Sequence, residues 1–159
     1  MLFTTHLLTG AGVGTLTGEP VSAFALGIIS HHLCDRIPHF DGGSIYPLVG
    51  KDEQWKPIHW VIAIADVCIG LGLASLLIVQ GLYSPSMIAG ATGAVAPDVV
   101  DSIPWTRAAF RATYFGKKYH AFHASFHATA PLRQIYFGLG VQIVLLGVSL
   151  LYIIRGGWQ

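Results

Sequence analysis

Charged residues are scarce in this chain. Lysine, arginine, aspartate and glutamate together make up 11% of the 159 residues, whereas a soluble domain carries about 25%. So few charges could hardly cover a surface exposed to water, which argues against an ordinary soluble domain. The 2 cysteines are too few for a disulfide framework. The sequence has no long basic stretch and a formal net charge of +1, so we expect no nucleic-acid partner.

Apolar residues are abundant instead, at 53% of the chain, and the mean hydropathy is +0.59. Segments 58–82 and 135–154 are almost wholly apolar, and each reaches the roughly 20 residues that a membrane-spanning helix needs. Backbone groups in lipid must be hydrogen-bonded internally, and the sequence lacks the alternating strands of a barrel. The sequence therefore predicts an all-α polytopic integral membrane protein.

Three shorter apolar segments, 2–16, 21–33 and 86–100, accompany the two long ones. At about 1.5 Å of rise per residue each would reach only some 20 Å, so some of them are short or re-entrant. Gly18-Glu19-Pro20 is a tight-turn signal, which predicts that the first two segments form a helical hairpin. We expect one membrane domain, residues 1–159, with about five membrane helices and the last transmembrane helix at 134–155.

The basic residues predict the orientation of these segments. Loops 35–57 and 101–133 contain all lysines and arginines except Arg155. By the positive-inside rule both loops are cytoplasmic, in a multi-pass protein of the inner (cytoplasmic) membrane. All 8 histidines then fall at or near the cytoplasmic ends of segments, so a site that they form would face the cytoplasm.

An internal repeat is also present in the sequence. Residues 27–39 (GIISHHLCDRIPH) align without a gap with residues 93–105 (GAVAPDVVDSIPW), and the matches include Gly, Asp, Ile and Pro. The repeat halves are roughly 1–50 and 58–110. His32 and Asp35 in one copy correspond to Asp98 and Asp101 in the other, whereas His31 aligns with Pro97, which makes His31 the weaker candidate for a ligand.

A cluster of histidines and carboxylates is what a divalent metal site needs, and ionisable residues in membrane segments are functional candidates. We expect a divalent metal cofactor, zinc or alternatively manganese. The candidate ligands are His6, His32, Asp35, Asp98, Asp101, His123 and His127, with His39, Asp41 and His59 as additional candidates. For any one Asp at a helix end, the alternative is a cap or a side chain that reaches out to the interface.

Segment 114–129 (YFGKKYHAFHASFHAT) predicts a His-rich interfacial helix within 112–130. Its aromatic residues form one stripe at helical spacing, and His120, His123 and His127 form a second stripe beside it. Alternatively, these histidines only decorate an interfacial helix or respond to pH. Asp66 lies two turns from His59 and either orients a ligand or bonds to Ser or Thr of a neighbouring helix.

Three motifs carry a resemblance to a known family: Thr5-His6, the stretch GAVAPDVVD ending at Asp101, and HASFHAT at 123–129. In this order they resemble the YdjM-like family of membrane-bound metal-dependent hydrolases, which is distantly similar to zinc-dependent phospholipases C. The chain departs from the family pattern in the spacing of Asp98 and Asp101, in Ser102 where the family has His, and in Phe126 where it has Thr. The resemblance implies metal-dependent hydrolysis.

The resulting hypothesis is a membrane-embedded, metal-dependent hydrolase that cleaves a phosphoester or acyl bond of a lipid-like substrate at the cytoplasmic interface. Candidate catalytic residues, which would take or give a proton, are His120, Asp66 and His31. Candidates for binding an anionic headgroup are Arg36, Arg107 and Arg111. Besides the lipid bilayer and the substrate, a homo-oligomeric partner is left open. The alternative function is a non-enzymatic metal or proton carrier, or a scaffold protein.

Overall fold

The computed structural model describes residues 1–49 and 55–156, and all regular structure in these ranges is helical, which confirms the predicted all-α class. The helices follow one another along the chain as α1 (Phe3–Gly14), α2 (Pro20–Asp35), η1 (Gly42–Ile45), α3 (Tyr46–Val49), α4 (Pro57–Val79), α5 (Pro85–Asp101), α6 (Pro104–Ala112), α7 (Tyr114–Phe126), η2 (Leu132–Gln134) and α8 (Ile135–Gly156).

Helices α1, α2 and α5 form the most closely packed part of the protein. Glycines allow this packing: a Cβ atom on Gly10 or Gly27 would run into the carbonyl oxygen of Gly90, and one on Gly93 would run into the carbonyl oxygen of Phe24. Small residues let the backbones of neighbouring helices approach each other in this way. The two copies of the predicted repeat end α2 and α5 and therefore lie side by side, although the repeat itself stays a prediction.

The turn before α2 is fixed by Glu19. Its carboxylate accepts hydrogen bonds from the backbone N–H groups of Val21 and Ser22, at 2.8 and 2.7 Å, and Pro20 occupies the first helical position. Both features favour a helix start. Because α2 returns alongside α1, the last residues of α2 reach the end of the molecule where α1 begins.

Helices α4 and α8 pack against α1 and carry about half of the exposed large apolar side chains. In the described part of the chain, Pro57–Val79 and Leu132–Gly156 are the two stretches long and apolar enough to cross a membrane, by length and composition. Polar residues inside these two stretches accept hydrogen bonds from the backbone at the start of α1. Asp66 of α4 accepts hydrogen bonds from the N–H groups of Phe3 and Thr4, and Gln142 of α8 accepts from that of Leu2. The other predicted spans stay predictions.

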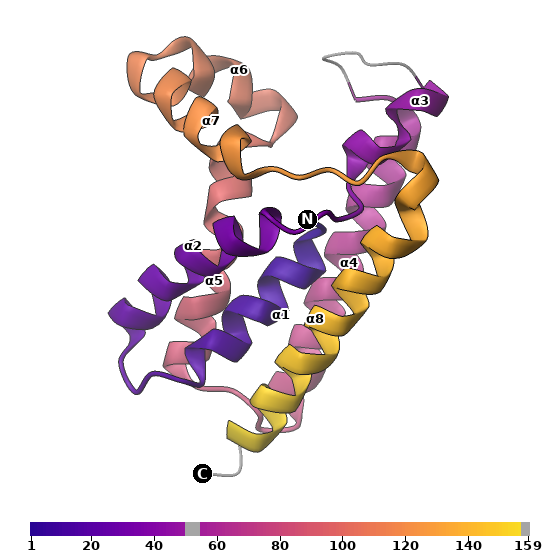
Figure 1. Cartoon of the computed structure of the whole chain (residues 1–159). Helices are drawn as coiled ribbons and strands as arrows, with labels where there is room; N and C mark the ends of the chain where they lie inside the picture. The colour runs from indigo at the N-terminus through magenta and orange to yellow at the C-terminus, as the bar shows by residue number, and fades with distance from the viewer. Residues whose placement is uncertain (50–54, 157–159) are drawn as a thin grey trace.

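The His-rich segment predicted as a helix within 112–130 is helical: α7 runs from Tyr114 to Phe126, and its interfacial position stays a prediction. A further helix, α6, ends just before it at Ala112, and the Thr113 hydroxyl accepts from the N–H of Gly116. This cap starts α7 as a new helix. In Figure 1, α6 and α7 project from the end of the bundle where the N-terminus and α3 lie, and the C-terminus lies at the other end.

Candidate metal centre

The side chain of Asp35, the last residue of α2, is completely buried among histidines. Its Oδ1 lies 3.2 Å from His6 Nε2 and 3.7 Å from His39 Nε2. Its Oδ2 lies 3.4 Å from His31 Nε2 and 3.9 Å from the Nε2 atoms of both His123 and His127. The amino group of Met1 also contacts Oδ1. We call the following residues the Asp35 cluster: His6, His31, Asp35, His39, Asp98, His123 and His127.

Asp98 completes the cluster from α5. Its Oδ1 is 3.6 Å from His123 Nε2, and its Oδ2 is 3.9 Å from His6 Nε2. Its side chain is 26% exposed, whereas that of Asp35 is 0% exposed. Of the two carboxylates, Asp98 is therefore the one that a molecule approaching from outside could touch.

Hydrogen bonds fix which nitrogen of three cluster histidines carries a hydrogen. The carbonyl oxygens of Ala94 and Ile37 can only accept, so the Nδ1 atoms of His31 and His39, at 2.8 and 2.9 Å, must donate to them. His123 Nδ1 donates to Asp101 Oδ2 at 3.2 Å. In neutral rings the Nε2 atom then has no hydrogen and presents a lone pair. All three Nε2 atoms are turned toward Asp35.

Two of these lone pairs face each other directly. His31 Nε2 lies 3.1 Å from His123 Nε2, and neither has a hydrogen to share in the neutral form. Two bare nitrogens at this distance repel each other unless a cation lies between them. Zinc bonds of about 2.0–2.1 Å place two tetrahedral nitrogen ligands roughly 3.3 Å apart, close to the observed separation.

Other buried polar atoms of the region also lack hydrogen-bond partners among the described residues. They are both ring nitrogens of His6, Nδ1 of His32, Oδ2 of Asp35 and Nε2 of His39. Buried polar atoms are normally paired, so several unpaired ligand atoms in one place indicate an ion. The side chains offer three ligand groups, each with its ligand atoms within 4.8 Å of one another: His6, His31 and Asp98; His31, His32 and His123; and Asp35, His39 and His127.

Asp101 lies behind His123. Its Oδ2 accepts from the Nδ1 atoms of His120 at 2.8 Å and of His123, while its Oδ1 accepts from Arg111 Nε at 2.8 Å. Burial alone would raise the pKa of Asp101, but Arg111 and His120 lower it. Asp101 touches the nitrogen of His123 that points away from the cluster, the position of a carboxylate that orients a metal ligand.

The surroundings of His123 favour a positive charge. Burial alone would lower the pKa of this imidazole, but the nearby carboxylates of Asp35, Asp98 and Asp101 raise it. The same carboxylates would stabilise a metal cation at this place.

A short bridge connects the two segments that supply His39 and His127. The N–H of His39 donates to the carbonyl of Ala128 at 3.1 Å, and the N–H of Ala130 donates to the carbonyl of His39 at 2.8 Å. The Thr129 hydroxyl donates to Asp41 Oδ2 at 2.7 Å. Asp41 in turn lies 3.4 Å from both His39 Nε2 and His127 Nδ1. Sequence reasoning missed Thr129, because nothing in its spacing relates it to a residue so far away in the chain.

The structure brings most of the predicted site residues together, but not all. His32 is buried and its ring lies edge-on to that of His31, with centroids 5.1 Å apart. His59 and Asp66 of α4 contact the chain elsewhere: His59 Nδ1 accepts from the N–H of Lys56 at 3.0 Å, and Asp66 caps α1. The structure thus favours a structural role for Asp66, as one of the two alternatives held.

The three candidate arginines lie near the same end of the molecule. Arg36 donates to the carbonyl of Ser125 at 2.9 Å and lies over the ring of Phe126. Arg111 is held by the side chain and the carbonyl of Asp101. Arg107 lies on α6. Arg111 therefore supports Asp101, whereas a role in binding substrate stays a prediction for all three.

Comparisons with family models, with curated proteins and with solved structures find no match to this chain, so its function has to be argued from the geometry of the site.

Proposed function

We propose that the protein is a membrane-embedded, metal-dependent hydrolase whose Asp35 cluster holds divalent metal ions. The observation that supports this most is the pair of bare nitrogens, His31 Nε2 and His123 Nε2, 3.1 Å apart. A single proton shared between these two nitrogens would remove the repulsion in this pair only. The unpartnered nitrogens of His6 and His39 beside Asp35 favour metal ions over a single proton, and these residues would hold them.

The donor set fits zinc better than a harder ion. The cluster is rich in imidazole, a ligand suited to zinc, whereas magnesium and calcium prefer oxygen ligands. His6, His31, Asp98 and His123 would hold an ion on one side of Asp35, and His39 and His127 would hold one on the other. When bound, a zinc ion polarises the scissile phosphoester or acyl group and lowers the pKa of a water molecule beside it.

Residues around the cluster supply the remaining chemistry. His120 donates its Nδ1 hydrogen to Asp101, which leaves Nε2 available to take or return a proton. Its side chain is 41% exposed, so a leaving group could reach it. Asp98, the accessible carboxylate of the cluster, is placed to hold the attacking water. Arg36 and Arg107 are our candidates for contacts with an anionic headgroup.

The apolar surface of the molecule supports a membrane location for this activity. In α4 the buried residues are His59 and Gly70, and many of its large apolar side chains are exposed, among them Val61, Ile69 and Leu76. Such a surface is stable in lipid and unstable in water. We extend this to about five membrane segments in an inner membrane, with the site at the cytoplasmic interface and membership of the YdjM-like family. A bond in a lipid-like molecule is the substrate within reach of such a site.

The alternative, a metal or proton carrier, needs a polar path through the apolar region. Asp66 and Gln142 lie in the two candidate spans, but both are engaged by the first residues of α1. We therefore favour a hydrolase over a carrier.

Metal analysis of the purified protein, followed by hydrolysis assays, tests the proposal. Protein in detergent should retain zinc in stoichiometric amounts and should release phosphate or a headgroup from anionic phospholipids in a metal-dependent way. Asp35→Asn should lose both properties, and Glu19→Gln, which alters a carboxylate at the opposite end of α2, should keep both. Protein without stoichiometric metal would contradict the proposal, and metal uptake into liposomes without hydrolysis would favour the carrier.

A further inference from the structure

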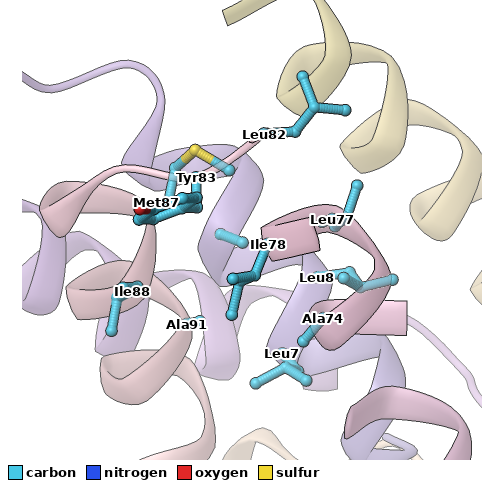
Figure 2. Close-up of a pocket in the computed structure, with 11 residues that line it drawn as sticks. Leu7, Leu8, Ala74, Leu77, Ile78, Leu82, Tyr83, Met87, Ile88 and Ala91 are labelled. Carbon is cyan, nitrogen blue, oxygen red and sulfur yellow. The ribbon is translucent and has the colours of Figure 1, made fainter. Parts of the chain in front are cut away.

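An apolar groove lies between α1, α4 and α5, and no residue of the Asp35 cluster lines it. Its cavity volume is about 60 Å³, and it is open to the outside. Figure 2 shows the side chains around it, which come from all three helices and from the link between α4 and α5. Those that matter here are Leu7, Ala74, Ile78, Leu82, Met87 and Ala91. Because its wall is apolar, the groove suits a hydrocarbon ligand.

The groove opens sideways, where α4 and α5 part. Both helices pack against α1, but they make little contact with each other. Ile78 of α4 and Ile88 of α5, which lie beside this gap, are 48% and 51% exposed. Since α4 is long and apolar enough to span a membrane, the gap faces the hydrocarbon layer in our proposal. The hydrocarbon chain of a lipid could therefore enter the groove from the bilayer without crossing water.

The groove begins close to the Asp35 cluster. Leu7 follows His6 directly in α1, and Ala91 lies on the same face of α5 as Asp98, seven residues earlier. At about 1.5 Å per residue, Asp98 is roughly 10 Å from the level of Ala91 and roughly 16 Å from that of Met87. One leaflet of hydrocarbon, half of a core of about 30 Å, has a similar depth. An acyl chain whose head lies at the cluster would thus end in the groove.

We propose that this groove binds one acyl chain of the lipid substrate while the bond to be hydrolysed lies at the Asp35 cluster. The inference rests on the proposed function, since it assigns a substrate to the same site. A hydrocarbon chain is favoured over a helix from a second copy, because the lining is apolar and begins at Leu7, directly after His6 of the cluster.

The position of Ala74 gives a direct test. It lines the groove from α4, so Ala74→Phe would fill the space, whereas Ala65→Phe introduces the same side chain at an exposed position of α4 that does not line the groove. The probe is phosphatidic acid with a diazirine midway along one acyl chain, incorporated in nanodiscs with the protein. After illumination, the labelled residues are identified by mass spectrometry.

We expect labelling to concentrate on residues 74–91 in the wild type and in Ala65→Phe. In Ala74→Phe we expect a loss of roughly tenfold, the effect of about two methylene groups that no longer find apolar contact. Labelling spread evenly over α4 and α8, or equal labelling of both variants, would overturn the inference. It would mean that bulk lipid or a second copy covers this face.

A second measurement separates this inference from the proposed function. Hydrolysis of long-chain phosphatidic acid is compared with hydrolysis of a phosphate ester that has no acyl chain. We expect Ala74→Phe to lose activity on the lipid and to keep both its zinc content and its activity on the chainless ester. Labelling in the groove without any hydrolysis would refute the hydrolase and keep the lipid site. Hydrolysis that Ala74→Phe leaves unchanged would refute the groove and keep the hydrolase.

Discussion

Replacing Asp101 by asparagine distinguishes a residue that orients a metal ligand from a residue that binds metal. Asp101 contacts Nδ1 of His123, whereas Nε2 of the same ring faces Asp35 and Asp98. An asparagine keeps the shape of the side chain but loses the charge. It can no longer hold His120, His123 and Arg111 together through charge-assisted hydrogen bonds.

The expected loss of metal affinity follows from the position of Asp101 behind His123, outside the ligand groups. Substituting a carboxylate that orients a metal-binding histidine typically costs 10–100-fold in metal affinity, about 1.4–2.7 kcal/mol. We therefore expect Asp101→Asn to bind the same number of zinc ions as the wild type at saturation, with a dissociation constant higher by roughly that factor. Competition with a chromophoric chelator in detergent measures this constant, and Glu19→Gln serves as the control for a charge removed elsewhere.

Two results would refute the reasoning. A loss of stoichiometric zinc in Asp101→Asn, with the helical content unchanged, would make Asp101 a ligand. An affinity within about threefold of the wild type, a difference of roughly 0.6 kcal/mol, would mean that its hydrogen bond to His123 has no bearing on metal binding.

Three more predictions concern the cluster and the helices that position it. Asp35→Asn should weaken zinc binding by more than the roughly 100-fold limit for an orienting residue, measured in the same competition assay. Gly93→Ala should lower thermal stability by about 1–3 kcal/mol, because its Cβ would meet the Phe24 carbonyl, whereas Gly140→Ala, with open space around it, should not. Zinc affinity should fall as the pH is lowered from about 7 to 5, because the nearby carboxylates raise the pKa of His123, and this imidazole must be neutral to bind. A chelator at pH 7 should remove the metal, and added zinc should restore it.

The gathering of the cluster could be predicted from the order of the segments. A turn at Gly18-Glu19-Pro20 returns the chain, so His6 and Asp35 had to lie at one end, and the same logic applies to Asp98. The place of His31 among the ligand groups could not be predicted, since the sequence offered it as a catalytic candidate and as the weaker candidate for a ligand. Alignment of the repeat compares positions along the sequence, whereas the role of His31 comes from packing against α1, where its ring stacks on that of His6 with centroids 4.0 Å apart.

The spacing of Asp98 and Asp101 in the sequence also could not predict that the two carboxylates have different roles. Asp98 and Asp101 are one turn apart and were expected to act alike, yet they approach different nitrogens of His123. Helix α6 was also not expected. A proline such as Pro104 cannot continue the helix before it, but it suits the first turn of a new helix. Arg111 of this new helix, α6, then donates a hydrogen bond to Asp101.

The cluster draws on widely separated parts of the chain, and this has a consequence for how the protein is made. His6 and His31 emerge early from the ribosome, Asp98 follows, and His127 comes after about four-fifths of the chain. Until then the cluster side chains of the first hairpin lack a partner that the structure places beside Asp35. If the cluster holds metal as we propose, an ion would join the last of these segments to the first, and the supply of metal would set when the nascent chain completes its folding.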